Sequence, residues 1–176
     1  MLLPRITDND FVLFGLPERQ ALDRDRLDER RRALQAEVHP DRFAAEGAAA
    51  QRVAMQWAVR VNEAHARLKD PLKRAAYLCE LRGVPIDAER NTAMPAAFLV
   101  RQMQWREALD EAADLSAVEA LDEEVTRDER AGLSRLTHLL DLAGDTAAAA
   151  AEVRALMFVA RFRDDIAHRL EALDAH

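Results

Sequence analysis

The sequence predicts an all-helical protein, and three observations support this prediction. Ala, Leu, Arg, Asp and Glu dominate the 176 residues, whereas Gly and Pro number only 5 and 6, a composition that favours helix. Apolar residues recur at helical spacing through most of the chain, and no stretch shows the alternation of a strand. Proline and glycine interrupt this pattern at a few places, which indicates separate helices joined by short connections.

Composition also limits the class of protein. The single cysteine excludes a disulfide framework and a four-cysteine zinc site. The start, MLLPRITDND, lacks a signal-peptide apolar run, and no later run approaches a membrane span, so we expect a soluble, cytoplasmic protein. The net charge of −7 is uneven, at +1 over residues 1–80 and −8 over residues 81–176. This asymmetry suggests two modules with different partners, and neither is basic enough to make nucleic acid the default partner.

The first half of the chain predicts three helices, over about residues 23–38, 48–69 and 72–82. Asp23 is a plausible N-cap, and Pro40 ends the first of these helices because proline breaks a helix interior. The middle helix carries one apolar stripe, made of Val53, Trp57, Val61, Ala64 and Leu68. That spacing places Trp57 in the expected core.

The second half predicts three further helices, which short loops should hold in an antiparallel bundle. A polar, proline-containing segment over residues 84–94 is the candidate linker to them. Ser116 and Glu119 have the spacing of a capping box, and Asp145 or Thr146 is expected to cap the last helix. The helices are expected over about residues 95–113, 116–142 and 146–173.

The first helix of this second module has an unusual distribution of apolar residues. At about 100° per residue, its core stripe contains Phe98, Trp105, Leu109 and Ala112. The opposite face contains Val100, Met103, Glu107 and Glu111, with Gln104 beside them and Leu99 at the edge. An apolar patch with an acidic rim is typical of a protein-binding surface. The alternative is that this face packs on the first module.

The tripeptide His39-Pro40-Asp41 lies between two expected helices. In an arbitrary protein it could simply stop a helix, cap a turn and leave a histidine on the surface. A contact site is the other interpretation, because a rigid turn has little entropy left to lose on binding. The carboxylate of Asp41 would suit a charge-assisted bond to an arginine of a partner.

A helix followed by His-Pro-Asp and a second helix resembles a J-domain. The segments DFVLFGLP, VHPDRF, VNEAHARLKDPLKRAAYL and FLVRQMQWREALDE extend the resemblance to one branch, the HscB (Hsc20) family of iron–sulfur co-chaperones, over about residues 10–174. This resemblance implies an L-shaped, all-α protein. Its parts would be a J-domain (8–82), a linker (83–94) and a three-helix scaffold-binding domain (95–176) on which the J-domain packs.

The same resemblance implies a role and two partners. The J-domain would bind a specialised, HscA-type Hsp70 and stimulate its ATPase. The C-terminal bundle would bind an IscU-type iron–sulfur scaffold protein and deliver it to that Hsp70. The ATP belongs to the partner, since this chain has no phosphate-binding Gly-rich loop. We therefore expect no enzymatic activity, no cofactor and no metal in this protein, and no nucleic-acid or membrane partner.

The resemblance also implies two sets of contact residues. For Hsp70 they are His39, Pro40 and Asp41, joined by nearby positive charge at Arg30, Arg32 and Arg42. J-domains usually carry that charge closer to the motif, where this chain has Ala36 and Glu37, and Arg31 occupies a usual core position. For the scaffold they are Leu99, Val100, Met103, Gln104, Glu107, Glu111 and Phe158. Gln104 replaces an acid often found in relatives, and Phe158 fits either an exposed anchor or a boundary residue.

Three other functions fit the sequence less well. A general J-domain co-chaperone with a different client would share the tripeptide and lack the Leu99–Glu111 patch. A hydrolase using His39 and Asp41 would need a second catalytic cluster, which the sequence does not offer. A carrier of the cluster itself would need more than one cysteine, and Cys79 is expected to be a buried thiol. The remaining histidines, which show no metal-ligand spacing, are His65, His138, His168 and His176.

Overall fold

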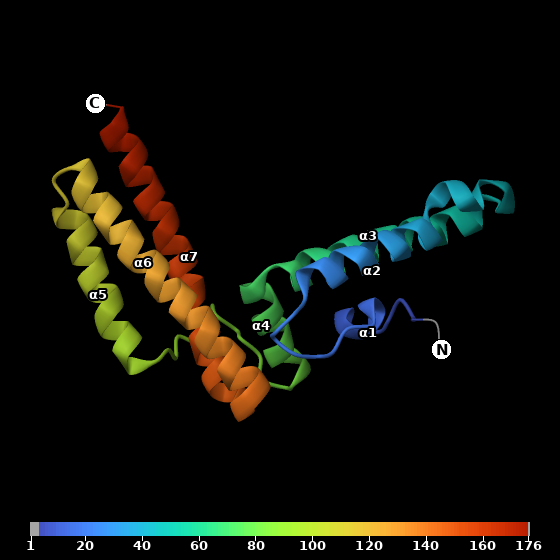
Figure 1. The fold of residues 1–176 in the computed structure, drawn as a ribbon, viewed down its shortest axis with the longest axis horizontal. Helices are drawn as coiled ribbons and strands as arrows, with labels where there is room; N and C mark the ends of the chain where they lie inside the picture. Colours follow the sequence, from blue (N-terminus) through green and yellow to red (C-terminus); the bar gives the residue numbers. More distant parts are fainter. Residues whose placement is uncertain (1–3, 176) are drawn as a thin grey trace. The chain divides into compact units, whose positions relative to one another are not determined.

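The computed structural model describes residues 4–175 of the chain, which divides into two compact units, Met1–Leu78 and Cys79–His176. Every regular element of the described residues is helical, as Figure 1 shows, so the predicted all-α class is confirmed. His176, one of the histidines without metal-ligand spacing, lies outside the described residues.

The first unit is a helical hairpin supported by a short N-terminal helix. It contains α1 (Asp10–Phe14), α2 (Arg24–Val38), the 3-10 helix η1 (Pro40–Glu46) and α3 (Ala48–Lys69), and α4 (Pro71–Leu81) begins in it. Helices α2 and α3 lie side by side (Figure 1). Asp23 caps α2 as predicted, because its carboxylate accepts the Arg26 amide at 3.1 Å. Asp70 accepts the amides of Leu72 and Lys73 in the same way at the start of α4.

The core of the first unit gathers around α1. Its fully buried side chains include Phe11, Leu13, Phe14, Leu27, Val61 and Leu68. The prediction that Trp57 belongs to this core is wrong, since Trp57 is only half-buried and Val53 is 53% exposed. In Figure 1 the N-terminal half of α3 extends past α1, and α2 and η1 are the helices that lie beside it there.

A buried carboxylate ties α1 to the rest of this unit. Asp10 has no exposed surface, and its oxygens lie 2.7 Å from Arg60 and 2.8 Å from Arg67. Its amide donates to the Tyr77 hydroxyl at 3.0 Å, and the Arg67 guanidinium lies 4.7 Å from the centre of the Tyr77 ring. This network could not be predicted from the sequence, because Asp10 looks like an ordinary acid in the first turn of a helix.

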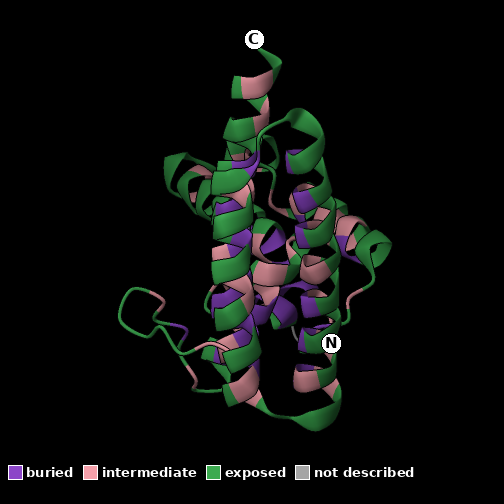
Figure 2. Cartoon of the chain, turned by 90° about the vertical axis from the view of Figure 1, so that its left-hand side faces the viewer, coloured by how far each residue is buried: buried purple, intermediate pink, exposed green. Residues whose placement is uncertain are grey.

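The second unit contains three long helices. They are α5 (Ala96–Glu111), α6 (Leu115–Thr137), which continues into the π-helical segment η2 (His138–Ala143), and α7 (Thr146–Asp174). Buried residues line the inner sides of the long helices in Figure 2, and exposed residues line the outer sides. The core side chains include Phe98, Trp105, Val125, Leu136, Val153, Val159, Phe162 and Ile166.

Two details of this unit differ from the prediction. The capping box is wrong: Asp114 is the N-cap of α6 and accepts the Ala117 amide at 2.8 Å, which places Ser116 inside the first turn. An aspartate at the N-cap captures a free amide directly, so the helix begins earlier than Ser116 and Glu119 suggested. The expected regular helix to residue 142 instead ends in η2. Asp145 caps α7, accepting the amide of Ala148 at 3.0 Å.

The segment between α4 and α5 is hydrogen-bonded to α7 and η2. Arg154 is 5% exposed, and its guanidinium donates to the carbonyls of Ile86 and Ala93 at 2.9 and 3.0 Å. Arg82 donates to the Leu140 carbonyl at 2.8 Å. These bonds satisfy backbone acceptors of an irregular segment, which therefore belongs to the second unit as an ordered part.

Candidate functional site

The His-Pro-Asp tripeptide forms the junction between α2 and η1. His39 has an extended backbone (φ −61°, ψ 129°), ends α2 and begins η1, and its Nδ1 accepts the Asp41 amide at 3.2 Å. Both side chains face solvent, at 58% exposure for His39 and 91% for Asp41. The Asp41 carboxylate lies 3.6 Å from Nδ1 of His39. The turn therefore presents a carboxylate to solvent from a locally hydrogen-bonded backbone.

The four arginines near this turn differ in their surroundings. Arg30 is half-buried and donates from Nε to the Phe14 carbonyl at 3.0 Å, which closes the end of α1. Arg31 reaches Asn62 of α3 at 3.3 Å, and its Nε is buried. Arg32 is exposed. Arg42, also exposed, donates to the Ala36 carbonyl at 2.9 Å.

The outer face of α5 carries the second set of expected contact residues. Its apolar members are all exposed, Leu99 at 40%, Val100 at 59% and Met103 at 71%, as the helical spacing predicted. Gln104, Glu107 and Glu111 are exposed beside them. We call these six residues the α5 face. It is an apolar surface with an acidic edge on the outside of a helix.

The inner face of α5 holds this surface in position. Phe98 and Trp105 are 5% and 2% exposed, and the Trp105 indole donates to Glu124 of α6 at 2.9 Å. Arg101 forms an ion pair with Asp128, also on α6. Because the indole N–H of a buried tryptophan needs a partner, this bond fixes the rotation of α5. The α5 face is therefore directed away from α6 by the packing behind it.

Phe158 of α7 is half-buried, so it matches a boundary residue better than a fully exposed anchor. Its ring centre lies 5.8 Å from that of Phe98 in an edge-to-face arrangement and 6.1 Å from that of Phe162 in a stacked one. The Arg106 guanidinium lies 5.6 Å from the Phe158 ring centre and 3.6 Å from Asp165. Phe158 thus joins α5 to α7 and keeps part of its ring in solvent. Arg106 is not among the contact residues predicted from the sequence, although its position on α5 beside the α5 face was a signal.

The other residues considered from the sequence occupy structural positions. Cys79 is a free, buried thiol, as predicted, and burial raises its pKa to about 11. His65 is 5% exposed and lies 2.8 Å from the Asp28 carboxylate, and this hydrogen bond lowers the Asp28 pKa. Within residues 4–175, no three His, Cys, Asp or Glu side chains are grouped as metal ligands. No described helix is long and apolar enough to cross a membrane.

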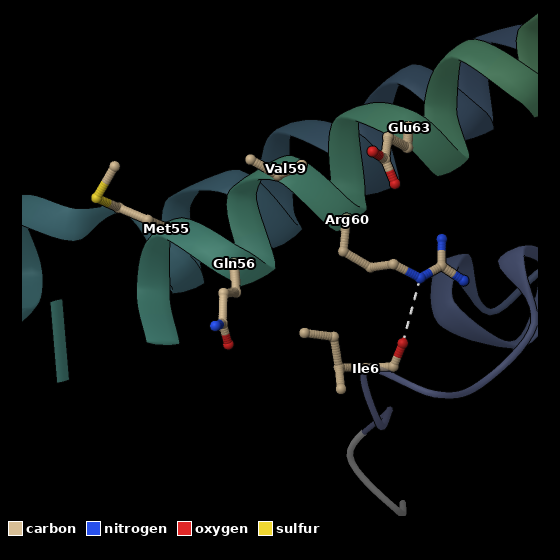
Figure 3. Close-up of a pocket in the computed structure, with 6 residues that line it drawn as sticks. All are labelled: Ile6, Met55, Gln56, Val59, Arg60 and Glu63. Carbon is tan, nitrogen blue, oxygen red and sulfur yellow. Dashed lines mark hydrogen bonds between the residues drawn. The ribbon is translucent and has the colours of Figure 1, made fainter. Parts of the chain in front are cut away.

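One groove of about 440 Å³ lies on the first unit, along the outer side of α3 (Figure 3). Ile6, Met55 and Val59 provide its apolar lining, and Gln56, Arg60 and Glu63 provide the polar part. The guanidinium of Arg60 donates to the Ile6 carbonyl at 3.2 Å, as the dashed line shows. None of the contact residues expected from the sequence lines this groove.

A helical hairpin with His-Pro-Asp after its first helix is the arrangement typical of J-domain co-chaperones, and a three-helix unit follows it in this chain. The model of the HSCB C-terminal oligomerisation domain matches residues 94–167. A co-chaperone protein HscB homolog of Burkholderia multivorans is 52% identical over 172 residues, which cover 96% of this chain and 98% of the relative.

Solved structures agree with this comparison. The chaperone HscB from Vibrio cholerae has a TM-score of 0.85 at 38% identity, over 94% of this chain and 99% of that one. The human co-chaperone protein HscB also has a TM-score of 0.85, at 23% identity, over 96% of this chain and 85% of that one, which shows a shared fold. The chain belongs to the HscB co-chaperone family.

Proposed function

We propose that this protein is a non-enzymatic co-chaperone of iron–sulfur cluster assembly with two binding surfaces. One surface, centred on His39-Pro40-Asp41 with Arg30, Arg32 and Arg42 nearby, binds a specialised, HscA-type Hsp70 and stimulates its ATPase. The other is the α5 face together with Phe158, which binds an IscU-type scaffold protein. The co-chaperone brings the scaffold to the Hsp70, so cluster transfer is coupled to ATP hydrolysis in the partner.

The α5 face gives the strongest support for this proposal. An exposed helix face should be polar, yet three large apolar side chains are exposed on this face, next to Glu107 and Glu111. Their opposite neighbours, Phe98 and Trp105, already provide the core side of α5, so the exposed ones are not needed for folding. Apolar centres with charged edges are the usual composition of protein interfaces. The acidic edge favours a partner with basic side chains around an apolar patch.

The tripeptide supports the other half of the proposal. At 91% exposure, the Asp41 carboxylate is available to an arginine of a partner. Arg32 adds an exposed positive charge on the preceding helix. The guanidinium of Arg30 is partly committed to Phe14, which makes Arg32 the stronger contact of the two.

The test is the steady-state ATPase of Hsp70 proteins from the source organism, measured with this protein, with and without the iron–sulfur scaffold. We expect stimulation by the co-chaperone alone and further, synergistic stimulation when the scaffold is added. Asp41→Asn should abolish both while leaving scaffold binding intact. Leu99→Ala/Met103→Ala should remove the synergy and weaken scaffold binding by about 10²-fold, since each truncated side chain loses about 1–2 kcal/mol of burial.

Matched controls separate binding from folding. Both apolar side chains are exposed in the free protein, so the double variant should unfold at the wild-type urea concentration. Phe158→Ala is a poorer probe, because Phe158 packs on Phe98 and Phe162 and its loss would also destabilise the second unit. Stimulation of the Hsp70 ATPase that does not depend on the scaffold would indicate a general J-domain co-chaperone with another client. If no Hsp70 responds, the proposal fails.

A further inference from the structure

The outer side of α3 carries a row of six exposed residues. They recur three or four positions apart, so at about 100° per residue they lie within about 80° of one another around the helix. The opposite side of the same helix, with Val61, Ala64 and Leu68, is buried in the core of the first unit. We call the exposed row the α3 stripe, and its members are Ala48, Arg52, Met55, Val59, Glu63 and Ala66.

The centre of the α3 stripe is apolar and its flanks are charged. Met55 is 58% exposed and Val59 57%, and both line the groove of about 440 Å³ that α3 forms with Ile6 (Figure 3). About one helical turn separates Arg52 from Met55 on one side and Glu63 from Val59 on the other. An apolar centre with charged edges is the usual composition of a protein interface.

The α3 stripe has the symmetry of a surface that binds itself. Counted from position 57, Met55 and Val59 each lie two positions away, Arg52 lies five positions before it and Glu63 six positions after it. Two α3 helices packed antiparallel about this point would therefore bring Met55 opposite Val59. They would also bring Arg52 to within about 1.5 Å, one residue of helical rise, of the level of Glu63. A two-fold axis repeats both pairings, because the same patch is used by each copy.

We propose that a second copy of this chain binds the α3 stripe, which gives a symmetric dimer of antiparallel α3 helices. Two pairs of Arg52 with Glu63 set the register, since complementary charges align the partners of an interface. Ala48 and Ala66, each nine positions from position 57, lie opposite each other and let the helices approach closely. This inference does not rest on the proposed function, because none of the residues assigned to the Hsp70 or to the scaffold belongs to the α3 stripe.

Sedimentation equilibrium of the full chain, at concentrations from about 5 to about 500 µM, tests the proposal. The contact surface is small, so we expect a weak dimer with a Kd on the order of 10–100 µM. Met55→Ser/Val59→Ser removes the apolar centre and should raise the Kd at least about tenfold. Both side chains are exposed in the single chain, so this variant should unfold at the wild-type urea concentration.

Charge reversal tests the register itself. Arg52→Glu or Glu63→Arg alone places like charges opposite each other at both ends of the contact, and each should raise the Kd at least about tenfold. An equimolar mixture of these two variants restores both pairs of opposite charges in the mixed dimer, so its Kd should return to within about threefold of the wild-type value. Glu29→Arg, at an exposed carboxylate of α2, is the matched control and should leave the Kd unchanged.

Three results would overturn the proposal. The wild type could remain monomeric up to about 500 µM, which would leave the α3 stripe to a different protein. A dimer that neither charge reversal weakens would use another surface. A mixture of the two charge-reversal variants that associates no better than either alone would exclude the antiparallel register. The measurement contains no Hsp70 and no scaffold, so its outcome is separate from that of the proposed function.

Discussion

Asp10→Asn is expected to destabilise the first unit by about 3 kcal/mol. The substitution keeps the shape of the side chain and removes a charge that has no exposed surface and two guanidinium partners, at 2.7 and 2.8 Å. Removing one member of a buried ion pair costs about 3–5 kcal/mol, because the other member is left uncompensated. The two guanidinium side chains, on Arg60 and Arg67, are 20% and 40% exposed, so water recovers part of that loss and the lower end of the range applies.

The assay uses the two tryptophans as separate reporters. Trp57 lies in the first unit and Trp105 in the second. In a Trp105→Phe background, fluorescence follows the unfolding of the first unit in urea, and in a Trp57→Phe background it follows the second. With an m-value of about 1.5 kcal/mol/M, Asp10→Asn should lower the midpoint of the Trp57 transition by about 2 M. Glu29→Gln, at an exposed carboxylate of α2, should leave it unchanged within about 0.3 M.

A small midpoint shift would refute the reasoning. If Asp10→Asn moves the Trp57 transition by less than about 0.5 M, desolvation of Asp10 cancels its attraction to the arginines, and the network adds specificity without stability. If the Trp105 transition moves equally, the effect does not belong to the first unit alone.

Three further predictions concern buried groups. A hydrogen bond from His65 lowers the pKa of Asp28 below its ordinary value of 3.8, so this bond stabilises the first unit above that pH and its contribution disappears as acid protonates the carboxylate. The midpoint of the Trp57 transition should therefore fall more between about pH 5 and pH 2 in the wild type than in Asp28→Asn. Burial raises the pKa of Cys79 to about 11, so a thiol reagent at pH 8 should react at least about 100-fold faster in urea than with the native protein, and equal rates would show an open site. A Cβ at Gly132 would lie 2.8 Å from Cδ2 of Leu156, so Gly132→Val should destabilise the second unit by about 1–3 kcal/mol in the Trp105 assay, and no loss would show that Leu156 can repack.

Much of the helical architecture could be predicted because its signals are local. Asp23 and Asp145 cap helices where the sequence suggested, since an N-cap bond spans only three residues. The exposure of Val100 and Met103 could be predicted from their angle on α5 relative to Phe98 and Trp105. The capping box failed at Ser116 because Asp114, two positions earlier, caps the helix by accepting the Ala117 amide.

Other features depend on residues far apart in the chain. Trp57 has the spacing of a core residue, yet its burial is set by how far α1 reaches along α3. Phe158 is half-buried because Phe98, some 60 positions earlier, supplies the ring that covers it. The pairing of Asp10 with Arg67 likewise joins residues 57 positions apart.

The sequence by itself determined the six longer helices, most of their ends, the family resemblance and the residues on each face of α5, because helix periodicity and capping are properties of neighbouring residues. Only the tertiary structure decided which of these residues are committed to partners within the chain. The guanidinium of Arg42 is attached to the Ala36 carbonyl, and that of Arg30 to the Phe14 carbonyl. A charge on an exposed helix looks free in the sequence, but its availability depends on which unsatisfied backbone groups the fold brings within its reach.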